Sequence, residues 1–139
     1  MYLYINTSSP EKIILALINK KGEVLKLKNI KAEYQQSEKL LNEIDKIFAG
    51  TGLDLPDIKG ILAVKGPGSF TALRIGIATA NTLAWSLNIP ILGIENKNNQ
   101  TDKILIDKNY KKILNKTKFT KQTLPKYGKE PNITIKKSA

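Results

Sequence analysis

Short apolar runs with strand-like patterns occupy the first part of the chain. They cover Tyr2–Asn6, Lys12–Asn19 and Glu23–Ile30, and the second run is apolar almost throughout. A tight connection, Lys20–Gly22, separates the last two runs, which is typical of a β-hairpin. The pattern therefore predicts three antiparallel strands, of which the middle one is buried.

Helical periodicity begins at Gln36. Apolar residues recur there at helical spacing, which places them on one face of a helix. Ser37 is available as an N-terminal cap, and Gly50 follows the expected end of the helix. The apolar face consists of Leu40, Leu41, Ile44, Ile47 and Phe48.

Two more strands flank a second helix. Ile61–Lys65 is predicted as a strand, Phe70–Asn88 as a helix and Ile91–Glu95 as another strand, with Pro90 ending the helix. The resulting order is β-β-β-α-β-α-β. Three antiparallel strands followed by strands that alternate with helices indicate an α/β fold. We expect a mixed sheet with the layout of a ribonuclease H-like half domain and helices packed on it.

The net charge of +11 is unevenly distributed, since residues 1–95 carry +2 and residues 96–139 carry +9. Asn96–Asp102 is a polar stretch typical of a linker. The predicted domains are therefore a half domain, 1–95, and a Lys-rich segment, 96–139, which either is partly disordered or adds a strand through Ile104–Asp107. Such a segment is either a solvated tail or a surface for nucleic acid phosphates.

The composition removes several kinds of chemistry. The chain has neither Cys nor His, which excludes disulfides, thiolate metal sites, cysteine nucleophiles and histidine bases. No basic and apolar leader precedes Tyr2–Asn6, and the uncharged stretch Ile75–Ile94 contains Asn81, Asn88 and Pro90. These polar residues favour a buried helix and strand over a membrane span. We expect a reducing, cytoplasmic compartment and no membrane association.

The most informative motif runs from Gly66 to Gly76. A strand, a Gly-rich turn and a helix N-terminus follow one another there, and such a junction can hold an anion on exposed N–H groups. The same glycines can instead serve only a tight turn from strand to helix, and both interpretations are open at this point. The loop residues are Gly66, Pro67, Gly68, Ser69 and Thr71.

The helix after this loop has two unusual features. Arg74 is the single Arg of the chain and lies in the first turns, where the helix dipole disfavours a cation. It is either a bidentate donor for a partner's carboxylate or an ordinary surface Arg. Small residues recur every four positions at Ala72, Gly76 and Ala80, and the helix is apolar nearly all round. A second surface besides the sheet is therefore expected to cover it.

The run Gly-Pro-Gly-Ser-Phe-Thr-Ala-Leu-Arg-Ile-Gly, together with Gln36-Ser-Glu-Lys-Leu-Leu and Asn6-Thr7-Ser8, resembles the TsaB (YeaZ) family of tRNA threonylcarbamoyladenosine biosynthesis proteins. The resemblance covers residues 1 to about 95. It implies the actin-like ATPase superfamily, whose members normally have two such half domains. Residues 96–139 then correspond to a reduced remnant of the second lobe.

The resemblance also implies a function. It predicts a non-catalytic scaffold that supports a TsaD-like catalytic subunit, together with a TsaE-like ATPase, in threonylcarbamoyl transfer to adenosine in tRNA. ATP and metal are expected on those partners and none on this chain, because Asn6, Thr7 and Ser8 form a degenerate phosphate loop without the family's usual Asp. The residues expected to contact the partner lie on two helices: Gln36, Leu40, Ile44, Phe70, Leu73, Arg74, Ile77 and Ala80.

Three alternatives accompany this interpretation. The first is a small basic RNA-binding module that takes tRNA through the Lys-rich segment. The second is a degenerate ATPase or peptidase-like protein, although a chain without His or Cys lacks the usual nucleophile and base. The third is a homodimer formed through the same helices as the partner contact.

Overall fold

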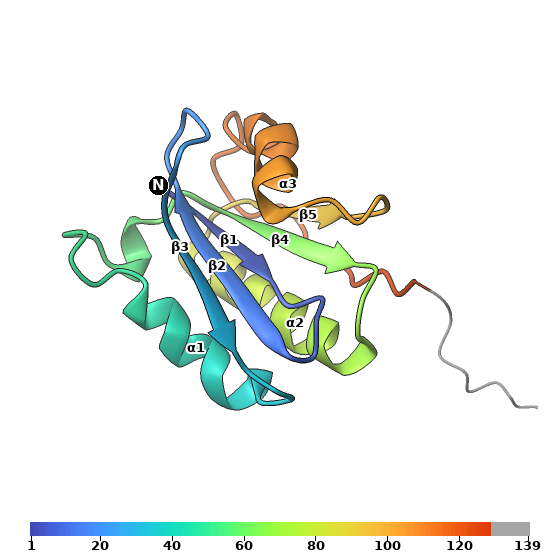
Figure 1. The fold of residues 1–139 in the computed structure, drawn as a ribbon. Helices are drawn as coiled ribbons and strands as arrows, with labels where there is room; N and C mark the ends of the chain where they lie inside the picture. The colour runs from blue at the N-terminus through green and yellow to red at the C-terminus, as the bar shows by residue number, and fades with distance from the viewer. Residues whose placement is uncertain (129–139) are drawn as a thin grey trace, which may run out of the picture.

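A five-stranded mixed sheet is the centre of the computed structural model, which describes residues 1–128. The strands lie in the order β3-β2-β1-β4-β5 (Figure 1). β1 pairs antiparallel with β2, which pairs antiparallel with β3, and β4 pairs parallel with both β1 and β5. The strand bounds are Tyr2–Asn6 for β1, Lys12–Ile18 for β2, Val24–Lys31 for β3, Gly60–Gly66 for β4 and Ile91–Glu95 for β5.

Two helices, α1 (Gln36–Lys46) and α2 (Phe70–Leu87), cover one face of the sheet. Alternate strand residues such as Leu3 and Leu15 point to this face and are fully buried there, as are Leu40 of α1 and Ala80 of α2. Although α2 is the longest helix, no helix in the described part of the chain combines the length and apolar character that a membrane span needs. A short 3-10 helix, η1 (Leu55–Asp57), precedes β4.

The opposite face is covered by α3 (Asp102–Asn109), followed by the short 3-10 helix η2 (Tyr110–Lys112). The predicted strand over Ile104–Asp107 is wrong, because this segment is helical. Thr101 caps the helix by accepting a hydrogen bond from the backbone N–H of Ile104. The neighbours Leu105 and Ile106 are both buried against the sheet.

Residues 115–128 form an extended strap along α2. At its beginning the N–H of Phe119 donates to the Asn88 side chain at 3.3 Å. Further along, Asn81 of α2 makes two hydrogen bonds with the backbone of Thr123, of 2.8 and 2.9 Å. The strap therefore follows α2 from its C-terminal end toward its N-terminal end. The domain boundary between the half domain, 1–95, and the Lys-rich segment, 96–139, stays a prediction.

The predicted order of strands and α-helices, β-β-β-α-β-α-β from β1 to β5, and the α/β class are confirmed. The predicted cap of the first helix is wrong, because Gln35 lies at the N-cap of α1 and makes no side-chain hydrogen bond there. Gln36 is instead buried and donates to the backbone oxygen of Ser9 at 3.0 Å. This bond ties the start of α1 to the loop between β1 and β2.

Candidate functional site

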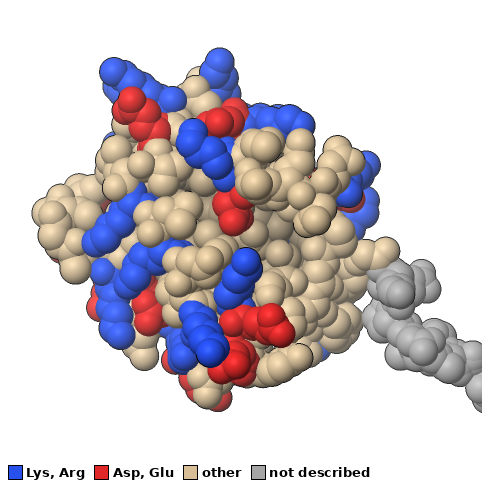
Figure 2. All heavy atoms as spheres, viewed as in Figure 1, with Lys and Arg blue, Asp and Glu red and all other residues tan. Residues whose placement is uncertain are grey.

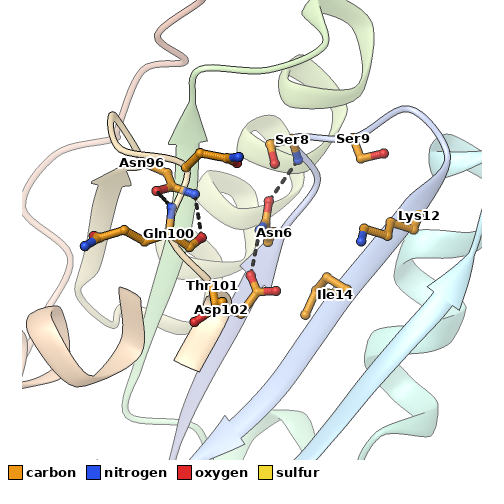
Figure 3. Close-up of a pocket in the computed structure, with 10 residues that line it drawn as sticks. Asn6, Ser8, Ser9, Lys12, Ile14, Asn96, Gln100, Thr101 and Asp102 are labelled. Atoms are coloured by element: carbon orange, nitrogen blue, oxygen red, sulfur yellow. Dashed lines mark hydrogen bonds between the residues drawn. The ribbon is translucent and has the colours of Figure 1, made fainter. Parts of the chain in front are cut away.

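A polar pocket of about 440 Å³ lies where β1 ends, between the β1–β2 loop and the segment that joins β5 to α3 (Figure 3). One wall is held by Asn96 and Gln100, whose two mutual hydrogen bonds measure 2.7 and 3.0 Å. The lining residues are Asn6, Ser8, Ser9, Lys12, Ile14, Asn96, Asn99, Gln100, Thr101 and Asp102.

Asp102 is the centre of the hydrogen bonds in this pocket. Its Oδ1 accepts from the hydroxyl of Tyr4 at 2.6 Å and from Nδ2 of Asn6 at 2.7 Å. The Oδ1 of Asn6 in turn accepts from the N–H of Ser8 at 2.9 Å, which fixes the turn after β1. Burial, and then the hydrogen bond to Asp102, raise the pKa of Tyr4 well above its ordinary value.

The donor set does not fit a nucleotide with a divalent metal ion. Asp102 is the one carboxylate that lines the pocket, and Asn6 supplies an amide in the degenerate phosphate loop. A magnesium ion needs six well-placed oxygen ligands, usually with one or two carboxylates. Within residues 1–128 no three Asp or Glu side chains gather at one point. Ser8 and Ser9 have no His beside them as a base, so the lining lacks the usual partner of a serine nucleophile.

Thr7, the middle residue of the predicted phosphate loop, does not line the pocket. It is buried and lies against α2, where a Cβ at Gly76 would overlap its hydroxyl. Gly76 thus permits the close approach of the loop to the helix. The structure brings Asn6 and Ser8 to the pocket and sends Thr7 to the opposite side.

The loop Gly66–Ser69 is covered by two other segments. A Cβ at Gly66 would overlap the backbone oxygen of Lys126 in the strap, and a Cβ at Gly68 would overlap that of Ser8. The N–H of Ser69 donates to the same Ser8 oxygen at 2.9 Å. The glycines therefore serve close packing, and this geometry favours the tight-turn interpretation over an anion site.

The outward side of α2 carries exposed residues at helical spacing, which we call the α2 stripe: Phe70, Arg74, Ala78, Thr82 and Trp85. Trp85 is 68% exposed and Phe70 is 42% exposed. The Arg74 guanidinium lies 5.3 Å from the centre of the Phe70 ring, and the Tyr127 ring of the strap lies 4.5 Å from it. Trp85 also lines a groove of about 500 Å³ together with Phe119 of the strap.

Six of the eight residues predicted to contact a partner are inside this chain's own core. They are at most 3% exposed because they face the sheet or the other helix: Gln36, Leu40, Ile44, Leu73, Ile77 and Ala80. The assignment of a direct partner contact to these six is corrected here. Only Phe70 and Arg74 of the predicted set are exposed. Of the loop residues, Ser69 caps α2 through a 3.4 Å bond from the N–H of Ala72, and Thr71 is exposed.

Sequence reasoning missed Asp102 and Trp85. Asp102 was placed in a linker, although the sequence Thr101-Asp102 before Ile104 and Leu105 is a helix-start signal that points to α3. Trp85 was counted as part of an apolar helix. Trp85 comes 11 residues after Arg74, which is three helical turns, so both side chains lie on the same side of α2. That side is exposed.

Comparison with known proteins identifies the family. Residues 30–111 match the model of the family described as TsaD, tRNA N6-adenosine threonylcarbamoyltransferase. The TsaB protein of Haemophilus influenzae, named for tRNA threonylcarbamoyladenosine biosynthesis, is 33% identical over 89 residues, 64% of this chain and 37% of that protein. The structure of YeaZ from Pseudomonas aeruginosa matches with a TM-score of 0.60 and 27% identity. The chain belongs to the TsaB (YeaZ) family.

The region shared with the TsaB family is also shared with TsaD proteins. The tRNA N6-adenosine threonylcarbamoyltransferase of Geotalea uraniireducens is 35% identical over 63 residues, which are 45% of this chain and 18% of that enzyme. The YeaZ match covers 68% of this chain and 42% of the YeaZ chain. This TsaB-family chain therefore spans less than half the length of the relatives it matches.

Proposed function

We propose that this TsaB-family chain acts in the formation of threonylcarbamoyladenosine in tRNA, as a non-catalytic subunit that binds and supports a TsaD-like catalytic subunit. The α2 stripe carries the proposal. The helix that begins with the family motif exposes Phe70 and Trp85 on one side. The chain's single Arg, Arg74, lies on the same side and packs over the Phe70 ring. Trp and Arg are the residues that most often supply binding energy at protein interfaces.

The chemistry of the pocket supports a role without catalysis. Its one carboxylate, Asp102, already accepts two hydrogen bonds, and no lining residue is a His or a Cys. In this proposal ATP and the metal ion belong to the TsaD-like subunit and to a TsaE-like ATPase that joins the complex. The complex is proposed to act in the cytoplasm.

Copurification with the TsaD protein of the same cell tests the proposal. We expect Ala78→Arg to abolish copurification, because Ala78 lies in the middle of the α2 stripe and its exposed side chain leaves room for folding. Substitutions at the buried Ile77 or Ala80 would disrupt the core instead and are unsuitable. Ala49→Arg, at an exposed position beyond α1, adds the same side chain elsewhere and should copurify normally.

Two results would contradict the proposal. One is normal copurification of the Ala78→Arg variant. The other is equal loss with Ala49→Arg, since the effect would then follow from added charge and not from the α2 stripe.

A further inference from the structure

Six exposed lysines gather at the end of the sheet where β2 ends and where β1 and β4 begin. They lie on three connections: the β2–β3 hairpin, the turn before β4, and the segment that starts with η2. We call this set the basic edge: Lys20, Lys21, Lys59, Lys111, Lys112 and Lys116. Figure 2 shows lysine side chains along the upper rim of the molecule, above the hairpin and α3.

Direct contacts bring these three connections together. Tyr110 lies on the hairpin so closely that a Cβ at Gly22 would be only 2.5 Å from its ring. Ile113 lies in the same way against Gly60 at the start of β4. A cavity of about 770 Å³ then has both Lys59 and Lys116 in its lining. The six lysines therefore belong to one continuous surface, although 96 positions separate the first from the last.

The lysines of the basic edge differ from those on β3 and α1. Among the described residues, none of the six forms an ion pair. The lysines on β3 and α1 are engaged, either with carboxylates at 3.2 to 3.8 Å or with backbone oxygens at 2.7 to 2.9 Å. These engaged lysines are Lys26, Lys28, Lys31, Lys39 and Lys46.

Three carboxylates lie on the same connections as the six lysines, which leaves the side chains of the region with a net charge of +3. They are Glu23, Asp54 and Asp57. Glu23 accepts from the Asn19 side chain at 2.6 Å, and Asp57 accepts from the N–H of Asp54 at 2.8 Å. These bonds are local, and none of the ion pairs among the described residues involves a lysine of the basic edge. Lys112 donates to the neutral Asn109 side chain at 3.2 Å and keeps its charge available. A row of ammonium groups without carboxylate partners is suited to a ligand with repeated negative charges.

We propose that the basic edge is an RNA-binding surface that contacts phosphates of the backbone without regard to sequence. Lysines act as point charges toward phosphates, and the absence of Arg from this surface leaves no bidentate donor for reading bases. The choice of RNA among polyanions rests on the proposed function in tRNA modification. The charge argument is independent of that function.

Titration of the chain with an unmodified tRNA transcript over a range of salt concentrations tests the proposal. The test variant carries Lys20→Gln, Lys21→Gln, Lys111→Gln and Lys112→Gln. The matched control carries Lys26→Gln, Lys31→Gln, Lys39→Gln and Lys46→Gln, which removes the same charge from the β3 and α1 surface. Each lost phosphate contact lowers the slope of log K against log salt by about 0.7, so the test variant should lose about 3 in slope.

We expect the test variant to lose at least about tenfold in affinity and the control to stay within about twofold. Equal losses in both variants, an unchanged test variant, or wild-type chain that does not bind tRNA would overturn the proposal. Tighter binding to anionic phospholipid vesicles than to tRNA would overturn it as well. The pair Lys59→Gln and Lys116→Gln repeats the test with a different part of the basic edge. Because copurification with the TsaD protein uses no RNA, the two proposals fail separately.

Discussion

The hydroxyl of Tyr4 donates a 2.6 Å hydrogen bond to Asp102, a residue 98 positions further along the chain. Tyr4 lies in the middle of β1, opposite Ala16 of β2 and Leu62 of β4, and Asp102 is the first residue of α3. The bond joins the central strand to the helix on the face opposite α1 and α2. It also sets the carboxylate in the wall of the polar pocket.

Asp102→Ala should destabilise the fold by about 1–3 kcal/mol, because it leaves the buried Tyr4 hydroxyl without an acceptor. Urea unfolding measures the change. Asp107→Ala is the control on the same helix, since Asp107 is exposed and makes only a surface ion pair with Lys103. An equal loss in the two variants would show that the Tyr4 bond adds nothing.

The raised pKa of Tyr4 predicts a loss of stability in alkaline solution. Above the ordinary tyrosine pKa of about 10, the unfolded chain releases a proton that the folded chain retains. The free energy of unfolding therefore falls as the pH rises. In Tyr4→Phe the fall should be shallower, by a difference that approaches about 1.4 kcal/mol per pH unit above pH 10, as measured by urea unfolding between pH 9 and about 11.5. Parallel curves for wild type and variant would contradict this account.

Gly76→Ala should destabilise the fold by about 1–3 kcal/mol, because the added methyl group overlaps Thr7 of the β1–β2 loop. Thermal unfolding measures the effect. The double variant Thr7→Gly with Gly76→Ala should lose less than the sum of the single variants, since it removes the atoms that collide. Strict additivity would mean that the loop and α2 do not meet in this way.

Asn81→Ala should release the strap from α2, because both hydrogen bonds to the Thr123 backbone depend on that side chain. Hydrogen exchange of residues 115–128 should become faster, while exchange in β1 and β4 stays unchanged. Thr82→Ala, at the next position of the helix, is the control. Unchanged exchange of the strap in the Asn81 variant would contradict the prediction.

The sequence was sufficient for the sheet and the two helices on its first face. In β2 an apolar run from Ile13 to Ile18 indicates a central strand, and the spacing of Leu40 and Ile44 indicates one face of α1. These patterns are local, so they are visible without the partner element. The residues that these patterns place on a buried face are buried in the structure.

The site was harder to predict because its residues meet only through tertiary contacts. Asp102 reaches Asn6 across 96 positions, and no local pattern encodes that distance. The sequence also left open which face of α2 packs against the sheet, since a helix that is apolar nearly all round has no evident inner face. The structure resolves this by burying Leu73, Ile77 and Ala80 and exposing Trp85.

The affinity of the chain for the TsaD protein of the same cell, measured by titration calorimetry, tests the central claim most directly. Trp85→Ala removes the most exposed aromatic side chain of α2, and Leu25→Ala, 55% exposed on β3, is the matched control. We predict a loss of at least about 2 kcal/mol for Trp85→Ala, which is about thirtyfold in Kd, and a change within about twofold for Leu25→Ala. Unchanged affinity of Trp85→Ala, or the same loss in Leu25→Ala, would contradict the claim that α2 binds the partner.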